Sequence, residues 1–311
     1  MSRYEIFRSD NLTVYLNGGD PPSPTVLIAF DHWRPVHNDR DPGFAEEFAI
    51  GHAMDVICVR CQTNAWWQYP EMADALAVIA GFAADWSRVI TYGSSMGGYA
   101  ALRYADMLGA AAAIAISPQY SIAPATAPWE HRYDEEASAI DFIHEPPIQA
   151  HAACRYIAVF DPINPWDARH IERIKGDIPL EEFKFPLSGH PSFDYLNRIG
   201  LVSPVALALI EGSYDHRHFT ALARAARRSQ PQYWFHLTWM LEIHGHIRAA
   251  IDTGLIHASM QDDKPAAYAK AVRRLIPMGQ RSFAEKLHLV PEADRALLLE
   301  AARSVLEHDD R

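Results

Sequence analysis

The sequence predicts an α/β protein in which a mostly parallel, doubly wound sheet is followed by an all-helical C-terminal region. Short continuous apolar runs, typical of strands buried on both faces, alternate with helical patterns through the N-terminal two thirds of the chain. Such alternation indicates crossovers between parallel strands. The rest of the chain shows helical patterns alone. We therefore expect an α/β domain over residues 1–212 and a helical region over residues 213–311.

The expected elements follow one another along the chain. Two alternating runs, 3–9 and 12–18, are separated by Asp10 and Asn11 and predict an antiparallel opening pair. The buried parallel strands are expected at 25–30, 54–61, 87–93, 111–117, 155–160 and 181–187. Helices are expected at 70–84, 95–109, 167–176 and 192–212 in the first domain, the last one either continuous or broken at Pro204, and at 215–229, 231–252, 263–275 and 291–307 in the tail.

Residues 118–150 interrupt this alternation. The segment is rich in proline and shows no sustained period. A connection of this length after a central strand is more often a functional loop or cap than a plain connector. We expect it to form a functional loop or cap.

Composition narrows the function classes. The chain has 311 residues, a formal net charge of −11 and 49% hydrophobic residues. An acidic surface disfavours nucleic acid as a partner, because binding to phosphates is built on lysine and arginine. The chain has no apolar run long enough for a membrane helix, and its first residues alternate like a strand and not like a signal peptide. We expect a cytoplasmic protein that acts on neither nucleic acid nor membrane.

Cysteine and histidine spacing gives no sign of a metal or cofactor. Cys58 and Cys61 have a metal or redox spacing, but they lie in a strand-like run where positions three apart face opposite sides. His244 and His246, two apart in a helix, lie on different faces. We expect no disulfide, no metal and no cofactor.

The stretch Gly93-Ser94-Ser95-Met96-Gly97 carries the strongest chemical signal. It has the pattern Gly-x-Ser-x-Gly and stands between a predicted strand and a predicted helix. A nucleophilic serine on such a turn needs small residues two positions before and after it, so that strand and helix approach closely. This assigns Ser95 as the nucleophile. Met96 is then the first residue of the helix, and its backbone N–H can stabilise an oxyanion.

A serine nucleophile needs a base and a group that orients the base. His190 follows the last predicted strand and is preceded by a glycine, so it is the candidate base. Two aspartates follow the strand 155–160. Asp161 stands at the strand tip and is the preferred acid, whereas Asp167 stands where a helix N-cap belongs and is the alternative.

These residues resemble the α/β-hydrolase superfamily in the Gly-Ser-Ser-Met-Gly-Gly elbow and in the chain order Ser95, acid, His190. The resemblance covers residues 1–212. It implies a second oxyanion donor, a backbone N–H just after the third strand, often within a His-Gly sequence. Here that stretch is Phe30-Asp31-His32-Trp33, without the glycine, so Asp31 or His32 is implied. The resemblance also implies a lid after the sixth strand, where residues 118–150 fall.

Five tryptophans follow predicted strands on the side where the site is expected, and could form an aromatic wall for the substrate: Trp33, Trp66, Trp67, Trp129 and Trp166. Together these observations predict a serine hydrolase that cleaves a small carboxylic ester. Two alternatives stay open. One is an acyltransferase or thioesterase with the same triad, and the other is a non-catalytic interaction protein on a hydrolase scaffold. The helical region is a candidate surface for a protein partner or for homo-oligomerisation.

Overall fold

The computed structural model describes residues 2–19, 23–38 and 41–309. The chain divides into two compact units, Met1–Thr220 and Ala221–Arg311. The division falls inside helix α8 (His216–Ala226), beyond the expected boundary at residue 212. Tyr214 and His216 explain the difference, because their rings pack on Phe183 in the last strand of the first unit, at centroid distances of 4.2 and 5.8 Å.

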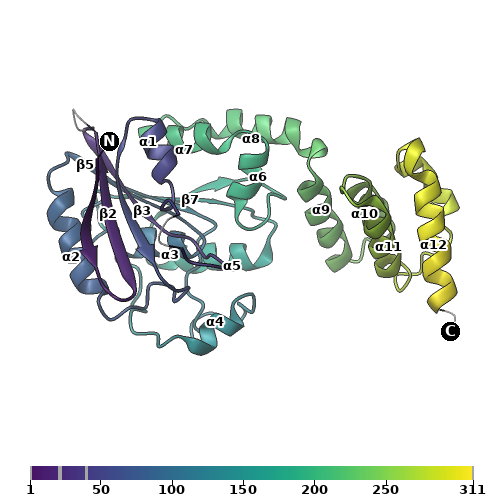
Figure 1. Cartoon of the computed structure of the whole chain (residues 1–311), viewed down its shortest axis with the longest axis horizontal. Helices are drawn as coiled ribbons and strands as arrows, with labels where there is room; N and C mark the ends of the chain where they lie inside the picture. The colour runs from purple at the N-terminus through teal and green to yellow at the C-terminus, as the bar shows by residue number, and fades with distance from the viewer. Residues whose placement is uncertain (1, 20–22, 39–40, 310–311) are drawn as a thin grey trace. The chain divides into compact units, whose positions relative to one another are not determined.

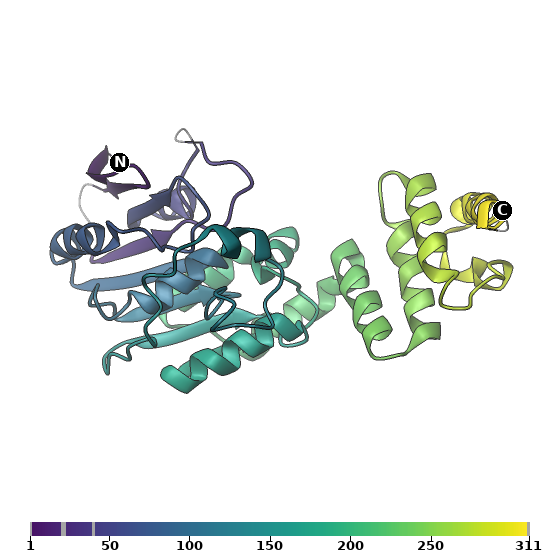
Figure 2. The same cartoon turned by 90° about the horizontal axis from the view of Figure 1, so that it is seen from below.

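An eight-stranded sheet forms the centre of the first unit (Figures 1 and 2). Its order is β1-β2-β4-β3-β5-β6-β7-β8. Strands β1 and β2 pair antiparallel, as expected, and β2 also pairs antiparallel with β4; all later pairs are parallel. The strands are β1 (Ser2–Arg8), β2 (Leu12–Gly18), β3 (Thr25–Phe30), β4 (Asp55–Cys61), β5 (Arg88–Ser94), β6 (Ala112–Ile116), β7 (Arg155–Phe160) and β8 (Leu180–Lys184).

Helices cover both faces of this sheet (Figure 1). Val26, Ile28 and Phe30 of β3 share one core cluster with buried residues of α2, α3 and α5. On the opposite face, Tyr92 of β5 contacts the ring of Phe193 in α6. The helices of this unit are α1 (Glu46–Gly51), α2 (Met72–Ala83), α3 (Met96–Arg103), α4 (Asp134–Ala139), α5 (Pro165–Asp177), α6 (Ser192–Arg198) and α7 (Val202–Glu211).

Glycines divide two of the expected helices. The expected helix 192–212 is α6 followed by α7, and the break comes at Gly200, whose φ is 72°. Pro204 lies instead in the first turn of α7, where proline costs no hydrogen bond. The expected helix 231–252 is likewise divided at Gly245, with φ 74°. In both places a left-handed backbone ends the helix.

The second unit is helical and has its own core. Leu255, Tyr268, Val272 and Leu298 are fully buried in one cluster. The elements are η1 (Arg227–Ser229), α9 (Pro231–Ile243), α10 (Ile247–Ser259), α11 (Lys264–Leu275), η2 (Ala284–Leu289), η3 (Glu292–Asp294) and α12 (Arg295–Asp309).

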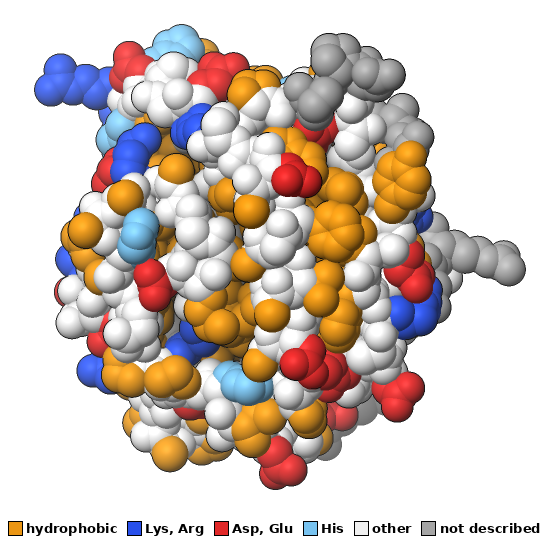
Figure 3. Space-filling model, turned by 90° about the vertical axis from the view of Figure 1, so that its left-hand side faces the viewer, with side chains coloured by type: hydrophobic (Ala, Val, Ile, Leu, Met, Phe, Trp, Pro, Cys, Tyr) orange, Lys and Arg blue, Asp and Glu red, His pale blue; other side chains and the backbone are white. Residues whose placement is uncertain are grey.

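The surface of the molecule carries both charged and apolar side chains. On the face shown in Figure 3, Lys and Arg side chains are scattered, and hydrophobic side chains lie between polar ones. Among the described residues, no single helix is long and apolar enough to span a bilayer; α6 and α7 reach that length only together, and they are bent by 117°. Cys58, Cys61 and Cys154 are buried free thiols. Within the described ranges, no three His, Cys, Asp or Glu side chains group as metal ligands.

Candidate active site

Ser95 occupies a strained turn between β5 and α3. Its φ of 53° and ψ of −116° are rare for a residue with a side chain. Gly93 and Gly97 make the turn possible, because a Cβ on Gly93 would lie 2.1 Å from the carbonyl oxygen of Gly97. A Cβ on Gly97 would lie 2.3 Å from the carbonyl oxygen of Phe30, at the end of β3. The two glycines thus bring the elbow against the segment that follows β3.

His190 lies beside this serine. It stands in the loop after β8, and its Nε2 is 2.9 Å from the Oγ of Ser95. The hydroxyl can therefore donate its proton directly to the imidazole. The structure brings together the two residues that the sequence pairs across 95 positions.

Asp167, and not Asp161, contacts His190. The Nδ1 of His190 is 2.9 and 3.0 Å from the two carboxylate oxygens of Asp167. The preference for Asp161 is thus wrong as to the contact. The carboxylate of Asp161 is engaged elsewhere: it accepts the backbone N–H groups of Ile163, Leu187 and Gly189, at 2.9 to 3.0 Å. Asp161 therefore fixes the backbone of the loop that carries His190.

The expected N-cap role of Asp167 belongs to Asn164. The side chain of Asn164 accepts the N–H groups of Trp166 and Asp167 at the start of α5. Its capping leaves the carboxylate of Asp167 free for the histidine.

Burial raises the pKa of Asp161 to about 6, against the opposing hydrogen bonds from three amides.

Asp167 is also paired with a buried ionic chain. Arg132 Nη1 donates to Asp167 at 2.9 Å, and its other nitrogens hold both oxygens of Glu130. His170 Nδ1 accepts the N–H of Tyr120, so the proton of the neutral ring is on Nε2, 2.8 Å from Glu130. Burial lowers the pKa of His170 and favours that neutral form.

The groups around Asp167 and Glu130 stabilise the ionised forms of both carboxylates. Burial opposes the ionisation of Asp167, but His190 and Arg132 nonetheless hold the pKa of this carboxyl below its ordinary value. In the same way, burial acts against Glu130, and hydrogen bonds from His170 and Arg132 hold the pKa of Glu130 well below its ordinary value. The carboxylate beside His190 is thus kept negative by a guanidinium from the insertion.

Of the three backbone N–H groups predicted to bind an oxyanion, the structure rejects one. The N–H of Asp31 donates to the carbonyl of Val59 at 3.0 Å, as part of the sheet, so it is not available. The N–H groups of Met96 and His32 have no acceptor among the described residues. Met96 opens helix α3, where backbone N–H groups lack a partner within the helix. These two amides remain candidate donors.

Two further side chains reach Ser95 from the insertion. Gln119 Nε2 donates to Ser95 Oγ at 2.9 Å. Tyr133 Oη lies 3.5 Å from that oxygen and 3.1 Å from Nε2 of His190. Burial raises the pKa of Tyr133, so its hydroxyl stays protonated. Neither residue stands in a motif, and only the length and position of the insertion pointed to this part of the chain.

An open pocket of about 500 Å³ lies over Ser95. Its wall includes Trp33, whose indole Nε1 donates to Glu136 at 2.6 Å. The full lining is His32, Trp33, Ser95, Arg132, Tyr133, Glu136, His190, Pro191 and Asp194. Charged and polar side chains thus surround a site with one indole and one phenol.

The other predicted tryptophans do not line this pocket. Trp66 and Trp67 are fully buried, so that prediction is wrong for both. Trp67 donates from Nε1 to the carbonyl of Met96 at 3.0 Å and thereby anchors the elbow, while Trp66 packs on Tyr133. Trp129 packs on the ring of His170, and Trp166 lies beside the guanidinium of Arg132. All four pack against other residues and lie outside the lining of the pocket.

No family model and no curated protein matches this chain. Solved structures resemble it at low identity. The capsule O-acetyltransferase of Neisseria meningitidis serogroup A is 11% identical, with a TM-score of 0.45, over 64% of this chain and 93% of that one. Alpha/beta hydrolase domain-containing protein 10 from mouse is 17% identical, with a TM-score of 0.44, over 69% and 100%.

Esterase 2 of Thermogutta terrifontis, phosphonylated by cyclosarin, is 15% identical, with a TM-score of 0.41, over 68% of this chain and 94% of that one. All three TM-scores lie below 0.5, so neither the activity nor the substrate of this protein is inferred from these structures. The fold rests instead on features of this chain. The sheet order with β2 antiparallel, the strained serine between β5 and α3, and the histidine after β8 together give the first unit the α/β-hydrolase fold.

Proposed function

We propose that this protein is a serine hydrolase that cleaves a carboxylic ester through an acyl-enzyme on Ser95. The observation that carries the proposal is the unbroken chain of contacts from Ser95 Oγ to His190 Nε2 and from His190 Nδ1 to Asp167. Nucleophile, base and orienting acid have this relation in acyl transfer on unrelated folds. The strained turn presents the hydroxyl of Ser95 to the pocket, and the amides of Met96 and His32, which have no acceptor within the described ranges, are placed to donate to an oxyanion.

The chemistry follows from the positions of the protons. Ser95 transfers its hydroxyl proton to His190 as Oγ attacks the ester carbonyl carbon, and Asp167 stabilises the imidazolium that forms. The N–H groups of Met96 and His32 bind the negative oxygen of the tetrahedral intermediate. His190 then gives its proton to the leaving alkoxide, so that the alcohol departs. Water then attacks the carbonyl carbon of the acyl-enzyme while His190 takes one of its protons. Return of this proton to Ser95 Oγ releases the carboxylic acid and restores Ser95.

The pocket favours a small and partly polar ester. Burial and the neighbouring Arg34 lower the pKa of His32, so its ring lines the pocket without a charge. Glu136 and Asp194 place carboxylates on the wall, and the guanidinium of Arg132, also in the lining, is already paired with Glu130 and Asp167. Carboxylates there accept hydrogen bonds from hydroxyl or ammonium groups and repel a second anion. We infer that the alcohol or acyl part is neutral or cationic.

The test compares Ser95 with its neighbour. Wild type, Ser95→Ala and Ser94→Ala are treated with a fluorophosphonate probe and with p-nitrophenyl acetate and butyrate. Ser94 is the matched control, because it is an adjacent, buried serine with the same side chain. We expect labelling of wild type and Ser94→Ala, and a loss of about 10³-fold or more in kcat for Ser95→Ala.

Absence of labelling in folded wild-type protein would overturn the proposal and would favour an interaction protein on this scaffold. Product analysis with an added alcohol or amine separates hydrolysis from transfer. If the acyl group passes to the acceptor and little free acid forms, the enzyme is an acyltransferase that uses the same residues. Thioester substrates test the thioesterase alternative in the same assay.

A further inference from the structure

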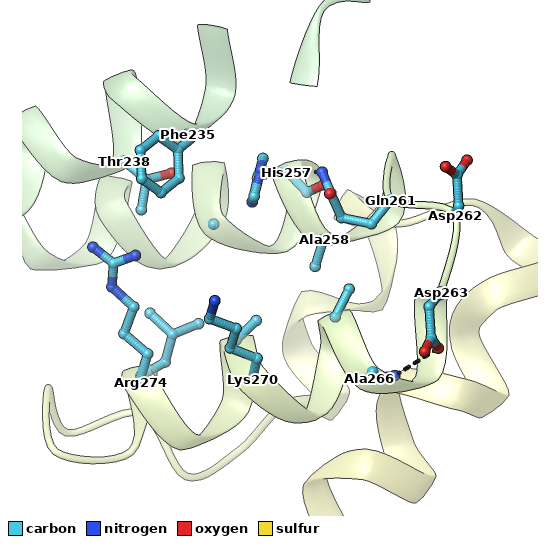
Figure 4. Close-up of a pocket in the computed structure, with 14 residues that line it drawn as sticks. Phe235, Thr238, His257, Ala258, Gln261, Asp262, Asp263, Ala266, Lys270 and Arg274 are labelled. Carbon is cyan, nitrogen blue, oxygen red and sulfur yellow. Dashed lines mark hydrogen bonds between the residues drawn. The ribbon is translucent and has the colours of Figure 1, made fainter. Parts of the chain in front are cut away.

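The helical unit contains a second pocket, of about 410 Å³, that no step above uses (Figure 4). It lies between α9, α10 and α11, and all the residues that line it belong to this unit. Gly254 faces Thr238 of α9, with a hypothetical Cβ 3.4 Å from the threonine methyl group, so the two helices approach closely there. This volume lies within the range of small-molecule sites.

The wall of the pocket combines apolar and cationic groups. Small side chains of α10 and α11 form an apolar floor: Ala258, Ala266, Ala267 and Ala271. The ring of Phe235 lies 5.6 Å from the ring of His257 and is 43% exposed. In Figure 4, Lys270 and Arg274 project from α11 toward the gap that His257 faces from α10.

At the end of the pocket formed by Lys270 and Arg274, the charges leave one cation without an ion-pair partner among the described residues. Arg274 is paired with Glu242. Lys270 has no ion-pair partner within the part of the chain that the structure describes. Burial lowers the pKa of His257, and the two nearby cations add to this effect, so the imidazole offers a hydrogen bond without a charge. The pocket therefore matches a ligand with a single negative charge.

The opposite end of the pocket is acidic. Asp262 and Asp263 stand at the turn between α10 and α11, away from Arg274 (Figure 4). Asp263 caps α11 by accepting the N–H of Ala266 at 3.2 Å. An anionic group is repelled from this end and attracted to the other. The ligand is thus oriented, with its charged group at Lys270 and Arg274 and its apolar part over the alanine floor.

We propose that this pocket binds a monocarboxylic acid with an apolar body, such as a medium-chain fatty acid. The carboxylate contacts Lys270 and Arg274, and the Nδ1–H of His257 supplies a further hydrogen bond, because the amide of Gln261 already donates to Nε2 of His257 at 3.1 Å. The apolar chain lies between Phe235 and the alanines. This site is independent of Ser95 and of the proposed ester hydrolysis.

The test measures binding of decanoate to the full chain by isothermal titration calorimetry. We expect saturable binding, and a Kd raised about fivefold or more by Lys270→Gln and by Arg274→Gln. Arg273→Gln is the matched control, because Arg273 is an exposed arginine next to Arg274 that does not line the pocket. Its Kd should equal that of the parent protein.

Three outcomes would overturn the proposal: no saturable binding of decanoate, equal effects of Lys270→Gln and Arg273→Gln, or equally tight binding of decyltrimethylammonium. A diazirine derivative of decanoate adds a readout of place, and its cross-links should fall on α10 and α11. If fluorophosphonate labelling fails while these results hold, only the proposed hydrolysis is lost.

Discussion

At the scale of single residues, the two aspartates near His190 make different contacts. Asp167 contacts the imidazole, whereas Asp161 accepts three backbone N–H groups around the loop that holds it. One carboxylate orients the base by contact, and the other by fixing the backbone. Substitutions at the two positions should therefore fail in different ways.

Asp167→Asn should lower kcat by about 10³- to 10⁴-fold, because an amide does not hold the required tautomer of His190 or stabilise its imidazolium. Asp161→Asn should instead lower the free energy of unfolding by about 1–3 kcal/mol, since its NH₂ group would meet a backbone N–H donor. Steady-state kinetics and urea unfolding of both variants measure the difference. A folded Asp161→Asn protein with the same loss of kcat as Asp167→Asn would contradict this division.

Arg132 should set the pH at which the site becomes active. It donates to Asp167, and Glu130, His170, Tyr133 and Asp161 are the other titratable groups around this pair. Without the guanidinium, the carboxyl of Asp167 takes up a proton more easily. The acid limb of kcat/KM should thus move to higher pH in Arg132→Gln, and Arg132→Lys should restore part of the shift. An unchanged pH profile with a uniformly lower rate would show a merely structural role.

Glu130 should make stability sensitive to acid. Its pKa in the folded protein lies below the ordinary value of 4.5, so its contribution is complete above that value and is lost as the pH falls through the lower, folded value. Glu130→Gln should therefore flatten the decline of the free energy of unfolding below about pH 4.5. Urea unfolding at a series of pH values measures this slope. Equal slopes in wild type and variant would contradict the assignment.

At the scale of elements, the elbow depends on close packing between β3, β5 and α3. A methyl group on Gly97 would lie 2.3 Å from the carbonyl oxygen of Phe30 and 2.8 Å from that of Asp31. Because backbone atoms cannot yield as a flexible side chain can, the substitution must move α3 or the oxyanion segment. The glycine therefore links the position of the nucleophile to that of the His32 amide.

Gly97→Ala should cost about 2 kcal/mol or more in the free energy of unfolding and should reduce fluorophosphonate labelling. Gly81→Ala is the control, because Gly81 lies in helix α2 with open space around its Cβ position. It should stabilise the protein by about 0.5–1 kcal/mol through helix propensity. Thermal unfolding and labelling rates test both. Normal stability and labelling in Gly97→Ala would contradict the packing argument.

The insertion is also an element with a specific part in the site. It supplies Gln119 and Tyr133 to the nucleophile, Arg132 to the acid, and Glu136 to the indole of Trp33. Only α4 is regular within it. The site is therefore assembled from strand ends on one side and from this irregular segment on the other.

At the scale of the whole molecule, the division at Thr220 separates the candidate active site from the proposed carboxylate-binding pocket. Every described residue of the candidate active site belongs to the first unit, and the carboxylate pocket belongs to the second. A chain truncated before Pro231 should therefore retain reaction of Ser95 with fluorophosphonate at close to the wild-type rate. Labelling and circular dichroism of the truncated chain test this. A folded but unreactive fragment would show that the second unit takes part in the chemistry.

The sequence by itself determined the strands and pointed to Ser95 and His190, which the structure places in contact, because these are local signals. An apolar run predicts a buried strand, and Gly93 and Gly97 report a close approach through their lack of side chains. His190 was found because a strand end and the residues after it are neighbours along the chain. The helix breaks at Gly200 and Gly245 are not predicted from the sequence, because a glycine within a helical pattern is compatible with either sign of φ.

Only the tertiary structure decided which aspartate meets the histidine, which amides are free and which tryptophans reach the pocket. Asp161 directly follows β7 and Asp167 comes seven residues after its end, yet the nearer carboxylate is engaged by backbone N–H groups from the loop of residues 187–189. The N–H of Asp31 is occupied by Val59 of a neighbouring strand. The insertion folds back over the elbow and buries Trp66 against Tyr133. Each of these outcomes depends on contacts between segments far apart in the chain, which no local pattern encodes.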